Sequence, residues 1–185
     1  MHFAPDTEEA LEFVVALGNT DPAASRSGED ELATVEALTA FLAGFVFTGR
    51  IDHDEKELRA VRETRSLMRQ VWMLEREAAV DVVNRMLRES QALPQLVRHG
   101  SSDWHLHGAD ADLPLAQRMQ VEAALALVDV IRTDEMGRLR VCAATDCAGL
   151  LLDLSRNGSK RFCSVRCGNR MNTIAFRERR SADGA

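Results

Sequence analysis

The sequence predicts a mainly α-helical protein that ends in a small cysteine-rich module. Between Asp54 and Gln91 there is neither Gly nor Pro, and apolar residues recur at helical spacing. All four cysteines lie in two close pairs near the C-terminus. We therefore expect a multi-helical N-terminal domain with a small β-hairpin over residues 1–137. A compact module follows over residues 138–180, and residues 181–185 are expected to form a disordered tail.

The charge of the chain divides at the same place. Residues 1–137 carry 13 Lys and Arg against 25 Asp and Glu, a net charge of −12, whereas residues 138–180 carry 10 against 3, a net charge of +7. An acidic body with a compact basic end indicates that a polyanion binds at that end, although surface charges also cluster by chance.

Nothing in the sequence points to a membrane or to export. The longest apolar stretch, Phe41–Phe47, is far shorter than the roughly 20 residues that span a bilayer. The first residues are acidic and do not resemble a signal peptide. We therefore expect a cytoplasmic protein, whose cysteines in that reducing compartment are metal ligands or free thiols rather than disulfides.

The helices of the body follow from apolar spacing and capping residues. We expect helices over residues 7–17 and 34–45, the second capped by Thr34, with a loop over residues 18–28 between them. Residues 54–91 form either one helix or two, with a break near residues 75–77. After Pro114 a helix runs to about Met136, where Gly137 stops it, and its apolar composition predicts that it is the central buried helix.

A small β-hairpin is expected over residues 95–107. Trp104 and Leu106 alternate there with His105 and His107, and His99 lies on the opposite strand. The three histidines form either a metal or pH-sensing site or, as we favour, a solvated polar face. The body contains no glycine-rich phosphate loop and no nucleophile with an obvious base, so we do not expect an enzyme.

The cysteines have the spacing of a zinc site. Cys142 and Cys147 form a C-x4-C pair, and Cys163 and Cys167 form a C-x3-C pair after 15 intervening residues. Two close pairs supply the tetrahedral sulfur ligands that Zn²⁺ prefers, and four cysteines close the site, so we expect one structural zinc ion.

The residues around the cysteines predict a knuckle, a β-hairpin and a helix, which is a treble-clef-like zinc finger. Residues 149–154 and 160–162 are expected to pair as strands around a tight turn at Asn157–Gly158, where both residues tolerate positive φ. Ser164 is placed to cap the final helix.

The segment from Leu152 to Arg170, L-D-L-S-R-N-G-S-K-R-F-C-S-V-R-C-G-N-R, closely resembles the CGNR zinc finger, which is named after its Cys-Gly-Asn-Arg tetrapeptide. The body is similar to the ABATE domain that usually precedes this finger, in residues 30–42 and in the lead-in over residues 137–142. The resemblance implies a bacterial, zinc-bound, stress-induced transcription regulator that binds DNA.

The final helix carries arginines along one side. At about 100° per residue, a stripe contains Arg166, Arg170, Thr173, Arg177 and Arg180. The face expected to pack on the finger contains Cys163, Cys167, Met171 and Ile174. Aligned guanidinium groups suit phosphate oxygens. The alternatives are a solvated helix face or, for Arg170, a structural contact with a backbone carbonyl or with an acidic residue of the body. The candidate nucleic-acid-binding residues are Arg156, Lys160, Arg161, Arg166, Arg170, Arg177 and Arg180.

We therefore expect a zinc-dependent transcription regulator that binds double-stranded DNA. The helical body would sense a small-molecule effector or form a homodimer, because one finger offers a small contact area. The alternative is a protein-interaction module whose basic finger docks on an acidic partner.

Overall fold

The computed structural model describes residues 3–98 and 104–183. In this part of the chain six α-helices account for most of the structure, and about 53% of the residues are helical, which confirms the mainly α fold. The elements in chain order are α1 (Pro5–Gly18), α2 (Val35–Leu42), α3 (Glu55–Trp72), α4 (Arg76–Glu89), β1 (Gln95–Val97), β2 (His105–His107), α5 (Leu115–Arg132), the 3-10 helix η1 (Met136–Arg138), β3 (Leu139–Val141), β4 (Leu150–Leu152) and α6 (Val165–Asp183).

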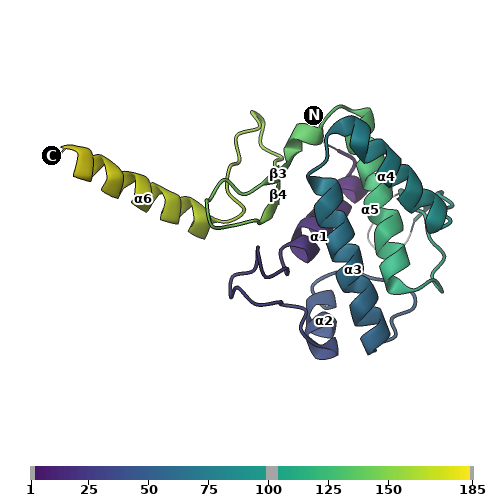
Figure 1. The fold of residues 1–185 in the computed structure, drawn as a ribbon. Coiled ribbons are helices and arrows are strands. Elements are labelled where there is room, and N and C mark those ends of the chain that lie inside the picture. Colours follow the sequence, from purple (N-terminus) through teal and green to yellow (C-terminus); the bar gives the residue numbers. More distant parts are fainter. Residues whose placement is uncertain (1–2, 99–103, 184–185) are drawn as a thin grey trace.

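Helix α5 lies at the centre of the body, as its composition predicted. It packs against α1, α3 and α4, and its buried side chains include Val121, Leu127 and Val130. Figure 1 shows α1 to α5 gathered into one body. A second cluster of buried residues lies where α1, α2 and α3 meet, and Phe13 there contacts the rings of Phe41, Phe45 and Phe47.

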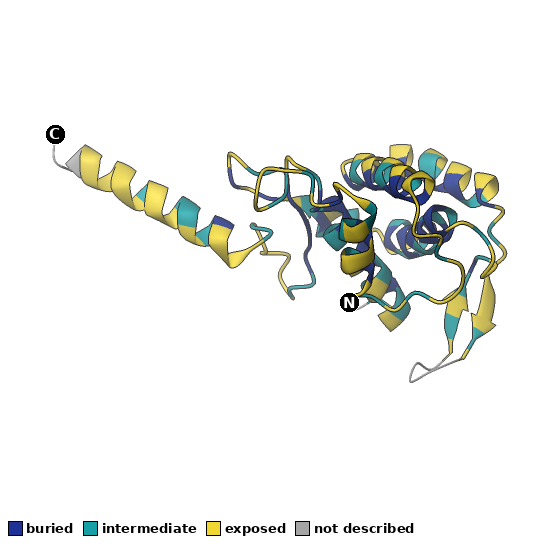
Figure 2. Ribbon diagram, turned by 90° about the horizontal axis from the view of Figure 1, so that it is seen from below, coloured by how far each residue is buried: buried dark blue, intermediate teal, exposed yellow. Residues whose placement is uncertain are grey.

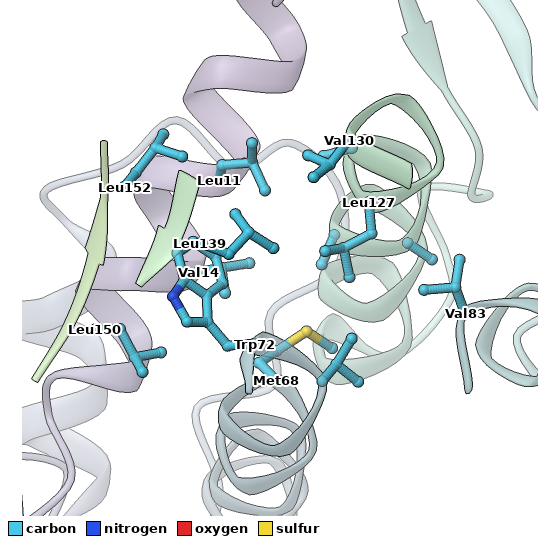
Figure 3. Packing of buried hydrophobic residues seen from close by; sticks show 14 of the residues in the cluster. Leu11, Val14, Met68, Trp72, Val83, Leu127, Val130, Leu139, Leu150 and Leu152 are labelled. Atoms are coloured by element: carbon cyan, nitrogen blue, oxygen red, sulfur yellow. The ribbon is translucent and has the colours of Figure 1, made fainter. Parts of the chain in front are cut away.

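The hairpin of β3 and β4 completes the core of the body. Leu139, Leu150 and Leu152 are buried in the same cluster as Leu11 of α1 and Trp72 of α3. Figure 3 shows these strand residues beside Leu11 of α1 and Trp72 of α3. The segment that begins the finger is thus packed into the body rather than joined to it by a flexible linker.

Side-chain caps define where the helices begin. Thr34 accepts a hydrogen bond from Ala37 N at 3.2 Å, as predicted, and Asp54 accepts one from Glu57 N at 2.7 Å. Residues 54–91 form two helices with a break at residues 73–75, which decides between the two alternatives.

The end of α5 differs from the prediction. The helix stops at Arg132, before Gly137, and Asp134 takes a left-handed conformation with φ 59°. Glu135 N then donates to Val130 O at 3.0 Å and Asp134 N to Ile131 O at 3.3 Å, which is a Schellman motif. Asp tolerates this conformation because its short polar side chain bonds locally, so no glycine is needed.

The β1–β2 hairpin forms where it was predicted, with Leu96 opposite Leu106 and Val97 opposite His105. The rings of His105 and His107 lie 4.9 Å apart between centroids. The favoured interpretation, a solvated histidine face, is wrong for these two residues, because His105 and His107 are half-buried whereas Trp104 and Leu106 are exposed. His99 lies outside the described residues, so its place beside them stays a prediction.

The predicted strand pairing in the finger is wrong. The strand β4 pairs with β3, with Leu139 opposite Leu152 and Val141 opposite Leu150, and residues 160–162 do not form a strand. Of Asn157 and Gly158, only Gly158 has a positive φ, 57°. We infer that β4 pairs with β3 rather than with residues 160–162 because this pairing buries Leu139 in the core of the body. Residues 160–162 are not part of that core.

Helix α6 projects away from the rest of the protein (Figure 1). Figure 2 shows exposed residues along nearly its whole length, with burial confined to its start. Met171 packs against the finger, but Ile174 is 37% exposed, so the prediction that both pack is wrong for Ile174. The helix reaches Asp183, three residues into the segment expected to be a tail.

Candidate metal centre and basic helix

Four segments of the finger bring the cysteines together. Cys142 directly follows β3, Cys147 lies in the loop before β4, Cys163 precedes α6, and Cys167 lies in the first turn of α6. Ser164 caps this helix by accepting a hydrogen bond from Cys167 N at 3.2 Å, as predicted. One sulfur from each segment can therefore reach a common point.

The four sulfurs have the spacing that zinc requires. They all lie within 4.8 Å of one another, with 3.7 Å between Cys147 and Cys163 and 3.8 Å between Cys163 and Cys167. Four sulfurs at about 2.3 Å from a tetrahedral zinc ion lie about 3.8 Å from one another. The cluster is therefore consistent with one structural zinc ion.

The backbone approaches the sulfurs closely at Gly149. A Cβ atom at this position would lie 2.8 Å from Cys163 Sγ and 3.2 Å from Cys147 Sγ, which is too close. Gly149 N donates to Cys147 Sγ, and Cys163 N donates to Cys142 Sγ, both at 3.4 Å. Backbone donors aimed at sulfur favour thiolates, so this cradle suits a metal-bound cluster.

Burial and a hydrogen bond set the acidity of these thiols. Burial raises the pKa of Cys147 and also raises the pKa of Cys163, whereas a hydrogen bond with Ser164 lowers the pKa of Cys167. Burial therefore opposes formation of several thiolates unless a cation compensates their charge, which a divalent metal does when it binds.

Arg170 is held inside the finger. Its Nη2 lies 2.6 Å from Asp146 Oδ1 and 3.7 Å from Cys167 Sγ. Asp146 lies in the knuckle between Cys142 and Cys147, so this ion pair connects α6 to the first cysteine pair. The partner is a carboxylate of the finger rather than of the body, and it leaves the Arg170 guanidinium turned toward the metal centre.

Asp153 organises the loop after β4, a role that the sequence analysis missed. This buried carboxylate accepts hydrogen bonds from Ser155 N at 3.0 Å, Lys160 N at 2.9 Å and Arg140 Nη1 at 3.0 Å. Burial raises its pKa, but these donors outweigh burial, so the pKa lies below its ordinary value. A lone Asp between Leu152 and Leu154 was the available signal, because a carboxylate in a buried apolar run needs partners.

Side chains of the body hold the other edge of the finger. Arg69 donates to Ala148 O at 3.0 Å and to Gly18 O at 2.7 Å. Trp72 Nε1 donates to Arg140 O at 3.0 Å, and Ala148 N donates to Ala23 O at 3.0 Å. The metal centre is thus held against α1, α3 and the loop after α1.

The remaining candidate residues divide into two groups. Arg156, Lys160 and Arg161 lie on the loop organised by Asp153, where Lys160 Nζ donates to Leu152 O and Arg161 stacks on Phe162. Arg166, Arg177 and Arg180 lie exposed on α6. Within the described residues none of these three forms an ion pair, and Arg166 makes only a 3.5 Å contact with Arg26 O. The structure therefore separates Arg170 from the other stripe arginines.

No helix in residues 3–98 and 104–183 is long and apolar enough to cross a membrane. The fold and the cysteine cluster define a helical protein with a C-terminal zinc finger. Residues 138–180 match the CGNR zinc finger, and residues 10–134 match the ABATE family, described as "Putative stress-induced transcription regulator". The chain belongs to this family, which confirms the resemblance. No curated protein matches it significantly.

Proposed function

We propose that this protein is a transcription regulator that binds double-stranded DNA through α6, with Cys142, Cys147, Cys163 and Cys167 as the ligands of its structural zinc ion. The observation that carries the proposal is the exposed row of Arg166, Arg177 and Arg180 on a helix that projects beyond the body. The family description, a transcription regulator, supports the same function.

The shape of the basic surface favours DNA over a protein partner. Arg166 and Arg177 are 11 residues apart, which is about 16 Å along a helix, and this length matches several phosphates of one strand. Arg156 and Arg161 add charge at the start of α6. A straight projecting helix with basic side chains fits the major groove, whereas docking on an acidic protein would not require the helix to project.

The acidic body has the regulatory part in this proposal. It opposes non-specific binding through its negative charge, and side chains at the end of α1 and on α3 hold the finger. It either binds a small-molecule effector or pairs two copies of the chain, in the cytoplasm of a bacterium. Sedimentation of the free protein and of its DNA complex distinguishes a dimer from a monomer.

Gel retardation with the full-length, zinc-loaded chain tests the proposal. We expect it to retard short duplexes of random sequence at low salt, and to lose most of this binding when Arg177 and Arg180 are both replaced by Ala. Arg85→Ala, an exposed arginine on α4, is the matched control and leaves binding unchanged. Binding to an acidic polypeptide but to no duplex would replace this proposal with the protein-partner alternative.

A further inference from the structure

A line of uncharged side chains runs along α6 on the face opposite the metal centre. Val165, Asn169, Thr173 and Phe176 follow one another at spacings of 4, 4 and 3 residues, so they lie above one another on a helix. Cys167 and Met171, which face the metal and the finger, lie on the other side of the same helix. We call these four residues the outer line.

The outer line exposes apolar side chains without a structural reason. Val165 is 80% exposed and Phe176 is 53% exposed, although neither packs on the body or the finger. The Asn169 side chain makes no hydrogen bond with any described residue, and Thr173 donates its hydroxyl hydrogen to Asn169 O at 2.9 Å. The Arg180 Cζ lies 5.9 Å from the centroid of the Phe176 ring, and Phe176 still remains more than half exposed. A ligand can therefore reach one amide, one methyl group and two apolar surfaces along this line.

Basic side chains flank the outer line. On a helical wheel of about 100° per residue, Arg166 and Arg177 lie on one side of it and Arg179 on the other, with Arg180 beyond Phe176 in the same row. The acidic Glu178 lies on the opposite face. An uncharged line with Arg166 and Arg177 on one side and Arg179 on the other can place guanidinium groups on the two phosphate backbones and the line itself over base edges.

We propose that the outer line reads base pairs in the major groove, with Asn169 as the specificity-determining residue for an adenine. A carboxamide can pair with both N6 and N7 of adenine, and apolar groups such as Val165, the Thr173 methyl and Phe176 contact the methyl group of thymine. Val165 to Phe176 spans about 16 Å, or about five base-pair steps of 3.4 Å. The expected target is thus a short site containing A·T pairs, and this inference rests on the proposed DNA binding.

Selection of bound duplexes from a random pool by the full-length protein tests the role of Asn169. We expect the wild type to enrich an adenine at one position, and Asn169→Ala to lose this preference by about five- to 150-fold while retaining binding to random duplex. Asn84→Ala, an exposed asparagine of α4, should select the same site as the wild type. Unchanged zinc content and thermal unfolding show that the variants fold.

Three outcomes separate this inference from the proposed function. Failure of the wild type to bind any duplex overturns DNA binding itself. Binding by the wild type with the same preference in Asn169→Ala overturns the inference and leaves DNA binding in place. Loss of the preference in Asn172→Ala instead of Asn169→Ala also overturns it, because Asn172 lies beside the outer line.

Discussion

The side chain of Asn19 pairs with both backbone groups of Leu150. Leu150 N donates to Asn19 Oδ1 at 2.7 Å, and Asn19 Nδ2 donates to Leu150 O at 3.0 Å. The side-chain amide thereby imitates a neighbouring strand and joins the end of α1 to β4. Because Leu150 is fully buried, these backbone groups have no access to water, and the contact couples the finger to the body.

Asn19→Ala should lower the free energy of unfolding by about 2 kcal/mol, because it leaves buried N–H and C=O groups without partners. Urea unfolding followed by circular dichroism measures this change. The control Asn84→Ala lies on an exposed helix face and should change the free energy of unfolding by less than about 0.5 kcal/mol. Equal stabilities of the two variants would show that the contact does not couple finger and body.

Cys163→Ser should abolish zinc binding, with the wild type holding one zinc ion per chain by elemental analysis. The free energy of structural zinc binding, on the order of 10 kcal/mol, orders the finger. Hydrogen exchange should then rise over residues 142–149 and 155–180, whereas β3 and β4 stay protected because the body holds them. Protein purified without chelators that contains no zinc contradicts this prediction.

The double replacement of His105 and His107 by Gln should leave the metal content at one zinc ion per chain.

Gly149→Ala should weaken zinc binding while the body stays folded. The added methyl group would lie 2.8 Å from Cys163 Sγ, so one sulfur must move from its place in the tetrahedron. Gly137→Ala is the matched control, because no atom lies within 4 Å of the Cβ position there. Competition with a chromogenic chelator should show earlier release of zinc from Gly149→Ala than from Gly137→Ala, and equal release would refute the prediction.

The ion pair of Asp30 and Arg65 should make stability depend on pH in the acid range. Arg65 binds both carboxylate oxygens, at 2.7 and 2.9 Å, and this hydrogen bonding lowers the pKa of Asp30 from 3.8 to about 2. A carboxyl group with a lowered pKa in the folded state contributes stability above its unfolded pKa and loses it as the pH falls through the folded one.

The difference in unfolding free energy between wild type and Asp30→Asn should therefore shrink as the pH falls from about 4 to about 2. Both proteins lose zinc in acid. Comparing their free energies of unfolding at the same pH cancels the effect of this loss on stability. A difference that stays constant over this range would show that the pKa of Asp30 is not lowered.

The sequence predicted those elements whose signals are local. Thr34 and Asp54 mark helix starts by their own capping bonds, and the two cysteine pairs define the metal centre by their spacing. The partner of β4 was not predictable in this way, because segments 139–141 and 160–162 are both short and the choice depends on burial of Leu139 in the body. The contact of Asn19 with Leu150 joins residues 131 positions apart, which no periodic pattern encodes.

The basic residues of α6 also show which features can be predicted from local sequence and which depend on the folded structure. Arg166, Arg177 and Arg180 lie exposed on the helix that the sequence predicted, but helical spacing could not reveal that Asp146 binds Arg170. The knuckle places Asp146 beside α6 only when the four cysteines are brought together in the folded finger.

Arg170→Ala should therefore lower zinc retention more than it lowers DNA affinity, in contrast to the other stripe arginines.

The affinity of the full-length protein for duplex DNA should fall steeply with salt. Each phosphate-paired arginine releases condensed counterions, and roughly four to six contacts give a slope of log K against log[salt] of roughly −4 to −5. Arg177→Ala and Arg180→Ala should each flatten the slope by about one and weaken all sequences alike, because phosphate contacts position the protein and do not specify a sequence.

Fluorescence anisotropy with a labelled duplex over a range of salt concentrations measures these slopes. Arg85→Ala on α4 should retain the wild-type slope, and zinc content should be the same in every variant because Arg177 and Arg180 lie beyond the cysteines. The full chain is required, since a fragment of residues 138–185 would expose Leu139, Leu150 and Leu152, which the body buries. A wild-type slope near zero, or equal slopes in the α6 and α4 variants, would show that the arginines of α6 do not contact phosphates.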